Sequence, residues 1–131
     1  MQVKLNDLYK KAIEINNRRN RISAWREGVN YYISEILDNY EGCKKTNFIS
    51  TDEDLEDALL IGASDWNKYS YGGFSLIYNE DIAKTLCTKS ELKRFDNGLK
   101  DPSGGFLWMD IQTRALKQAY LYIKRALCEM A

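Results

Sequence analysis

Residues 106–129, FLWMDIQTRALKQAYLYIKRALCE, carry the clearest structural signal in this chain. Ile111, Ala115, Ala119, Tyr122 and Ala126 recur at alternating spacings of four and three residues. This is the period of one face of an α-helix. The small alanines in the stripe would let a neighbouring helix approach closely. We therefore predict a long C-terminal helix that packs against other helices.

The same period occurs at the start of the chain. Leu5, Leu8, Ala12 and Ile15 are spaced three or four residues apart, which predicts an amphipathic helix over residues 4–20. Its polar end, NNRRNR, is expected to break the helix.

Ser23 is a candidate N-cap for a second helix, and Gly42 stands where a C′ glycine would end it. Gly28 inside this helix costs up to about 1 kcal/mol relative to alanine, and close packing of a neighbouring helix would explain its presence. The apolar stripe of this helix consists of Trp25, Val29, Tyr32, Ile33, Ile36, Leu37 and Tyr40.

Shorter helices are predicted between residues 51 and 95, after a loop at 43–50. Thr51 and the acids that follow it form a helix start, because a capping side chain and negative charges suit the positive end of the helix dipole. A further helix is expected around residues 82–87, and residues 88–91 have the spacing of a capping box. The sequence therefore predicts an all-α fold. We expect one domain over residues 1–131, a compact bundle of about five helices with an aromatic and glycine-rich turn.

Composition narrows the class of protein. The chain has 131 residues, 44% of them hydrophobic, with 19 basic and 19 acidic residues and no net charge. The absence of a basic excess argues against a dedicated nucleic-acid binder. Cys43, Cys87 and Cys128 lack the spacing of a disulfide scaffold or a zinc site. No membrane span or signal peptide is recognisable, so we expect a cytoplasmic protein with free thiols.

The sequence contains no histidine. This removes the commonest general base near neutral pH, every nucleophile that depends on histidine, and the commonest ligand of transition metals. The acids at residues 52–57 are already explained by helix capping. We therefore expect no enzyme, no catalytic residues, no metal site and no cofactor.

The most informative stretch for function is Trp66–Tyr78, WNKYSYGGFSLIY, in which five of thirteen residues are aromatic around two glycines. Aromatic faces offer stacking area, and glycines let backbone N–H groups approach a ligand. The lysine of a P-loop is missing. Two interpretations stay open: the aromatic residues fill the core where the chain turns, or they contact a ligand or partner.

Two motifs resemble those of a group of small uncharacterised proteins encoded by phages, prophages and conjugative elements. The first is Trp66-x-x-Tyr69-Ser70-x-Gly72-Gly73, and the second is Trp108-x-x-x-Gln112-x-Arg114-Ala115-Leu116-x-Gln118-Ala119. The resemblance covers residues 23–127 in outline and is specific between residues 64 and 119.

The resemblance implies a genomic setting in which small accessory proteins counter host defence. One such function is to bind and sequester a nucleotide-type immune signal, which would call for a homo-oligomer with pockets at its interfaces. In this hypothesis aromatic side chains stack on a base, while serine, glycine N–H groups and arginines hold phosphates. The expected ligand-binding residues are Trp66, Tyr69, Ser70, Tyr71, Gly72, Gly73, Arg94 and Arg114.

Two alternatives stay open. The protein is an interaction module that inhibits a host effector protein, or it is a nucleic-acid accessory factor. The second alternative would use the arginines at the end of the first helix and the start of the second, which are Arg18, Arg19, Arg21 and Arg26. A membrane partner is not expected.

Overall fold

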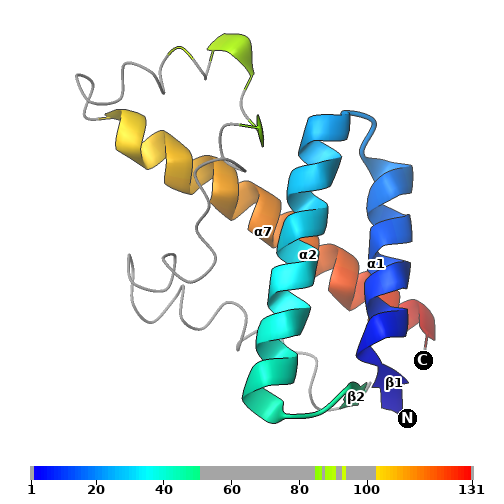
Figure 1. Cartoon of the computed structure of the whole chain (residues 1–131). Helices are drawn as coiled ribbons and strands as arrows, with labels where there is room; N and C mark the ends of the chain where they lie inside the picture. The colour runs from blue at the N-terminus through cyan, green and yellow to red at the C-terminus, as the bar shows by residue number, and fades with distance from the viewer. Residues whose placement is uncertain (1, 51–84, 87, 91–92, 94–102, 131) are drawn as a thin grey trace.

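The computed structural model describes residues 2–50, 85–86, 88–90, 93 and 103–130. In these residues the fold consists mainly of three long helices. Helix α1 (Leu5–Arg19) and helix α2 (Ser23–Lys44) form an antiparallel hairpin, and helix α7 (Ser103–Met130) crosses both of them obliquely (Figure 1). Each of the three helices contacts the other two. The predicted helical character is confirmed, while a bundle of about five helices is not confirmed by the described residues.

Helix α1 follows its predicted range within one residue at each end. Leu5, Leu8, Ala12 and Ile15 are buried, as the spacing predicts. Asp7 lies in the first turn and Arg18 and Arg19 lie in the last, where each charge complements the helix dipole.

Helix α2 differs from prediction at both ends. Ile22 is its N-cap residue rather than Ser23, and no side chain caps the first turn. Gly42 does not end the helix, which continues to Lys44. Lys45 takes the left-handed conformation instead, with φ 51°, and its N–H donates to the Glu41 carbonyl at 2.8 Å. The left-handed conformation that usually selects glycine is therefore taken three residues later than expected.

A small antiparallel sheet corrects the all-α prediction. Strand β1 (Gln2–Lys4) pairs with strand β2 (Phe48–Ser50), and Val3 lies opposite Ile49. Residues 48–50 were expected to be part of a loop. Val3 and Ile49 are buried, 5% and 1% exposed, so the sheet closes one end of the core. The Asn47 carbonyl also accepts a hydrogen bond from the Leu5 N–H, which satisfies one donor of the first turn of α1.

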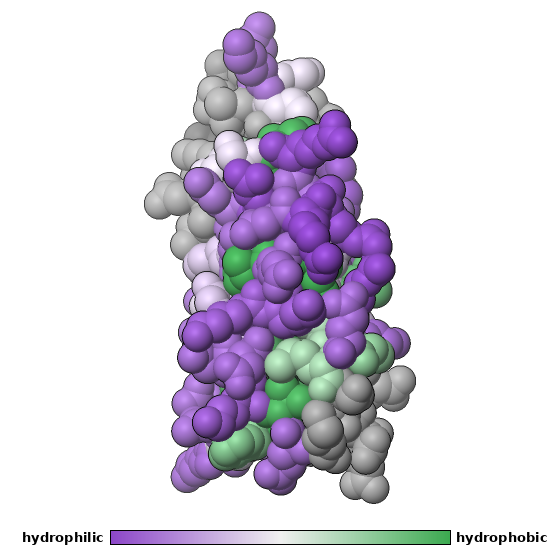
Figure 2. Space-filling model, turned by 90° about the vertical axis from the view of Figure 1, so that its right-hand side faces the viewer, coloured by the Kyte–Doolittle hydropathy of each residue, from purple (hydrophilic) through white to green (hydrophobic). Residues whose placement is uncertain are grey.

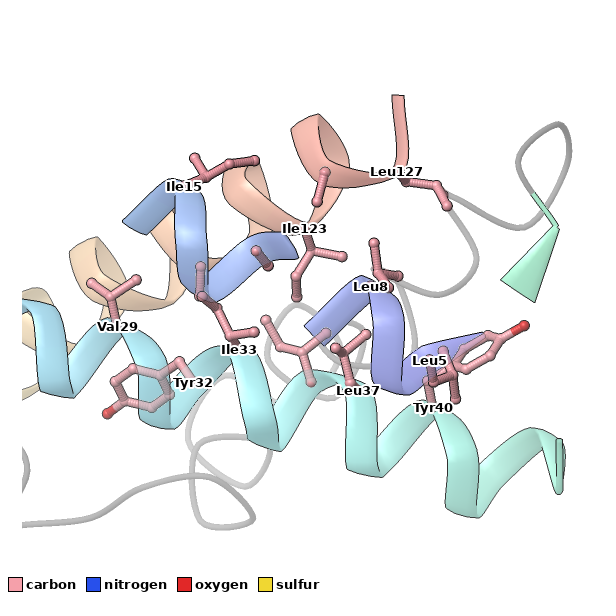
Figure 3. Packing of buried hydrophobic residues seen from close by; sticks show 14 of the residues in the cluster. Leu5, Leu8, Ile15, Val29, Tyr32, Ile33, Leu37, Tyr40, Ile123 and Leu127 are labelled. Carbon is pink, nitrogen blue, oxygen red and sulfur yellow. The ribbon is translucent and has the colours of Figure 1, made fainter. Parts of the chain in front are cut away.

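The core lies where the three helices meet. In Figure 3, Leu8 of α1 and Ile33 and Leu37 of α2 lie on the side where Ile123 and Leu127 of α7 pack. Ala115, Ala119 and Ala126 of α7 are fully buried. Their small side chains allow the close approach that the alanine spacing predicted.

Gly28 is also explained by close packing. A Cβ atom at this position would lie 2.9 Å from Cγ of Leu86 and closer still to one of its methyl groups. Leu86 is helical and 8% exposed. The glycine therefore makes room for an apolar side chain from a segment nearly sixty residues away.

The face of the molecule beside α1 is mainly hydrophilic, and the apolar spots on it are separated from one another (Figure 2). None of the helices in the described part of the chain is long and apolar enough to cross a membrane.

Candidate functional site

Most of the predicted ligand-binding residues lie outside the described residues. These are Trp66, Tyr69, Ser70, Tyr71, Gly72, Gly73 and Arg94. The remaining one, Arg114, lies on α7 and is exposed. That these residues come together in one ligand site therefore stays a prediction.

The second motif of the resemblance is largely structural. Gln112 is 1% exposed, and its side-chain carbonyl accepts a hydrogen bond from the Tyr32 hydroxyl of α2. Ala115, Leu116 and Ala119 are buried in the core. Arg114 belongs instead to the exposed side of α7, together with Lys117 one turn further along. Among the described side chains from Gln112 to Ala119, Arg114 and Lys117 are therefore the exposed ones.

Gln118 joins α7 to the turn between α1 and α2. Its Oε1 accepts hydrogen bonds from the Trp25 indole N–H at 2.8 Å and from the Asn20 amide at 3.2 Å. The Asn20 amide also lies 3.1 Å from the Tyr122 hydroxyl. These contacts link residues about a hundred positions apart in the sequence. They fix the position of the turn relative to α7.

Asn16, near the end of α1, also holds the turn between α1 and α2 in place. It is fully buried, and its amide donates to the Arg26 carbonyl at 2.8 Å and to the Asn30 side-chain carbonyl at 2.5 Å. Its own carbonyl accepts from the Asn20 amide at 2.6 Å. From the sequence, Asn16 was assigned to the polar end of the helix, and its buried role was not predicted. The signal was its position four residues after Ala12, which continues the buried stripe.

An arginine cluster covers this turn. Arg18, Arg19 and Arg21 are all exposed, and none of them forms an ion pair within the described residues. Arg26 is half-buried, and its guanidinium donates to the Asn20 carbonyl at 3.5 Å. No acidic residue occurs in the sequence between Glu14 and Glu27. The connection between α1 and α2 is therefore a strongly positive surface, and hydrogen bonds of Asn20 hold it in place. We call Arg18, Arg19 and Arg21 the arginine turn.

Two adjoining hollows lie at the opposite end of the α1–α2 hairpin. They have volumes of about 240 and 430 Å³ and share Leu5, Asn6 and Glu41 in their walls. Asp38 lines the smaller one, while Phe48, 40% exposed, lines the larger. Both hollows are open to solvent at the surface.

Glu35 and Asp38 lie one turn apart on α2. Burial raises the pKa of the Glu35 carboxyl, and the negative charge of Asp38 raises it further. The side chain is only partly buried, so water screens much of this effect.

No group of three metal-binding side chains occurs within the described ranges. Cys128 is a free, exposed cysteine.

Comparisons of this chain with family models, with curated proteins and with solved structures find no significant match.

Proposed function

We propose that this protein is an accessory factor of a phage or mobile element that counters host defence by binding and sequestering a nucleotide-type immune signal. The observation that carries the proposal is the exposed side of α7. Arg114 and Lys117 lie three residues apart there, so their charges fall on one side of the helix. Two adjacent cations of this kind suit a phosphate group.

The frame beneath these cations supports the same function. Gln112 anchors α7 to α2 through Tyr32, and Ala115 is fully buried between them. Arg114 therefore projects from a helix whose position is fixed by its neighbours. Preorganisation of this kind reduces the entropy lost on binding. The aromatic and glycine-rich stretch 66–74 would supply the stacking surface for the base. The absence of histidine from the sequence favours binding over catalysis.

A thermal-shift screen with cyclic and ADP-ribose-type nucleotides tests this function. A ligand at a hundred times its Kd stabilises the folded state by about 2.7 kcal/mol, which corresponds to a rise in Tm of roughly 10 °C for a domain of this size. Size-exclusion chromatography with light scattering should reveal a homo-oligomer. If no nucleotide in the panel raises Tm at millimolar concentration, the proposal fails.

Arg114→Gln should weaken binding of the ligand found in this screen by about 10- to 100-fold, because hydrogen bonds to charged groups contribute roughly 1.5–3 kcal/mol. Lys124→Gln is the matched control, since it removes one exposed positive charge further along α7. If Arg114→Gln and Lys124→Gln bind the ligand with equal affinity, Arg114 is not part of the binding site.

A second candidate function is inhibition of a host effector protein through direct contact. It is favoured by Leu121, which is 57% exposed on α7 between Lys117 and Lys124. An exposed apolar side chain flanked by cations suits an acidic protein surface with an apolar pocket. Tagged protein should then retain one host protein in stoichiometric amount. Leu121→Asp should release that protein, whereas Leu121→Met should retain it.

A further inference from the structure

We propose that the arginine turn binds the phosphate backbone of double-stranded DNA without regard to its sequence. The proposal uses neither Arg114 nor Lys117, and it does not rest on nucleotide sequestration.

The electrostatics of the turn itself favour a bound anion. Arg18 and Arg19 complement the dipole of α1, but Arg21 precedes the N-cap residue of α2 and Arg26 lies in its first turns. Positive charges are unfavourable at a helix N-terminus. Helix α2 also has no acidic residue in its first turn and no side-chain cap. A bound anion would offset each of these unfavourable features.

The arginines of the turn are not neutralised by acidic side chains in the described part of the chain. Lys11 pairs with Glu14 at 3.8 Å and with Glu129 at 3.6 Å, and Arg125 pairs with Glu129 at 3.5 Å. By contrast, Arg18, Arg19 and Arg21 form no ion pair in the described part of the chain. Their guanidinium groups are therefore available for bidentate contacts to phosphate.

The shape of this surface and the hydrogen bonds that fix its position favour a polymeric anion. The arginine turn comprises the last two residues of α1 and Arg21 of the three-residue connection to α2, and the hydrogen bonds of Asn20 with Asn16 and Arg26 hold this connection in place. Two hollows large enough for a small ligand lie at the other end of the hairpin. Cations on a protruding turn match charge that is spread along a polymer, whereas small ligands prefer concave sites.

The form of the nucleic acid follows from the neighbouring side chains. Binding to single strands usually relies on exposed aromatic rings that stack on bases. Trp25 is the aromatic residue nearest to the turn in the sequence, and it is half-buried with its indole N–H bonded to Gln118. Ile22, which is 71% exposed, offers no hydrogen bond to a base edge. Duplex binding through phosphates alone is therefore expected, with similar affinity for unrelated sequences.

The experiment measures fluorescence anisotropy of a labelled 20-base-pair DNA duplex from 50 to 200 mM KCl with the full chain. Three phosphate contacts predict a contribution of about 2.7 to the slope of log Kd against log salt. The triple variant R18Q/R19Q/R21Q should lose this contribution and bind roughly 10²- to 10³-fold more weakly at 100 mM KCl. The variant R18K/R19K/R21K keeps the charges and should keep most of the slope.

The matched control is K10Q/K44Q/K124Q, which removes three exposed positive charges outside the turn. It should bind DNA nearly as well as the wild type. Circular dichroism checks that each variant is folded. The proposal is overturned if the wild type does not bind duplex DNA at 50 mM KCl, or if the two glutamine variants lose the same affinity. Binding to phosphatidylserine vesicles but not to DNA would also overturn it, because the partner would then be an anionic membrane.

Discussion

Replacing Gly28 with alanine will destabilise the protein, although alanine is the better helix former. The new Cβ would lie 2.9 Å from Cγ of Leu86, whereas ordinary contacts start at 3.4 Å. The whole side chain of Leu86 must therefore move, and it is buried. Forcing a methyl group into a packed core costs typically 1–3 kcal/mol, and the gain in helix propensity is up to about 1 kcal/mol. The expected net loss is roughly 1 kcal/mol.

The sign of this effect should reverse when Leu86 is shortened. Leu86→Ala alone should cost about 2 kcal/mol, the lower end for removing a buried leucine, because the side chain lies at the edge of the core. In that background Gly28→Ala no longer meets an obstacle and should stabilise the protein by up to about 1 kcal/mol. The double-mutant cycle should therefore give a coupling energy between residues 28 and 86 of roughly 1–3 kcal/mol.

Urea unfolding followed by circular dichroism at 222 nm measures each free energy of unfolding. Gly42→Ala is the control, because a Cβ at this exposed helical position meets nothing within 4 Å. It should stabilise the protein by up to about 1 kcal/mol in either background. If Gly28→Ala stabilises the protein while Leu86 is intact, or if its effect is the same in both backgrounds, the packing of Leu86 on Gly28 is refuted.

Three further predictions concern individual side chains. Lys45→Gly should raise the free energy of unfolding by about 1 kcal/mol, because glycine adopts the left-handed φ of 51° without steric cost; Lys44→Gly, inside α2, should lower it in the same urea assay. Asn16→Ala should cost about 2–3 kcal/mol, because three part-buried hydrogen bonds of a fully buried residue lose a partner; a loss below 0.5 kcal/mol would contradict this network. Glu35→Gln should raise Tm slightly at pH 7 and leave it unchanged below pH 4. The pKa of Glu35 is raised in the folded state, so its ionisation opposes folding as pH increases through that value; equal changes in Tm at pH 4 and pH 7 would exclude this explanation.

The hydrophobic period of the sequence was sufficient to predict the three long helices that the structure describes. Leu5, Leu8 and Ala12 repeat along one side of α1, and Ala115 and Ala119 repeat along one side of α7. Such spacing depends only on neighbours within one or two helical turns, so local sequence carries it. The helix ends were harder. Gly42 offered a local stop signal, yet α2 continues to Lys44, and Lys45 takes the left-handed conformation that ends it.

The sheet and the arginine turn needed the tertiary structure. Strands β1 and β2 have three residues each, which is too short for a period of two to be recognised, and Val3 meets Ile49 only after α1 and α2 have folded back. The pairing of the two strands and the position of the turn between α1 and α2 both depend on contacts between residues far apart in the sequence.

For function, the sequence by itself determined the absence of histidine, the zero net charge, and the presence of arginines near residue 20. Only the tertiary structure decided how those groups are used. Gln112 and Gln118 belong to the second motif of the resemblance, and the structure shows that they accept hydrogen bonds from Tyr32 and Trp25 across helix interfaces. Arg18, Arg19 and Arg21 were named from the sequence as contacts for one alternative, a nucleic-acid accessory factor, and the structure shows all three exposed where α1 meets the connection to α2. Net charge is a sum over the whole chain, whereas binding depends on where the charges lie in space.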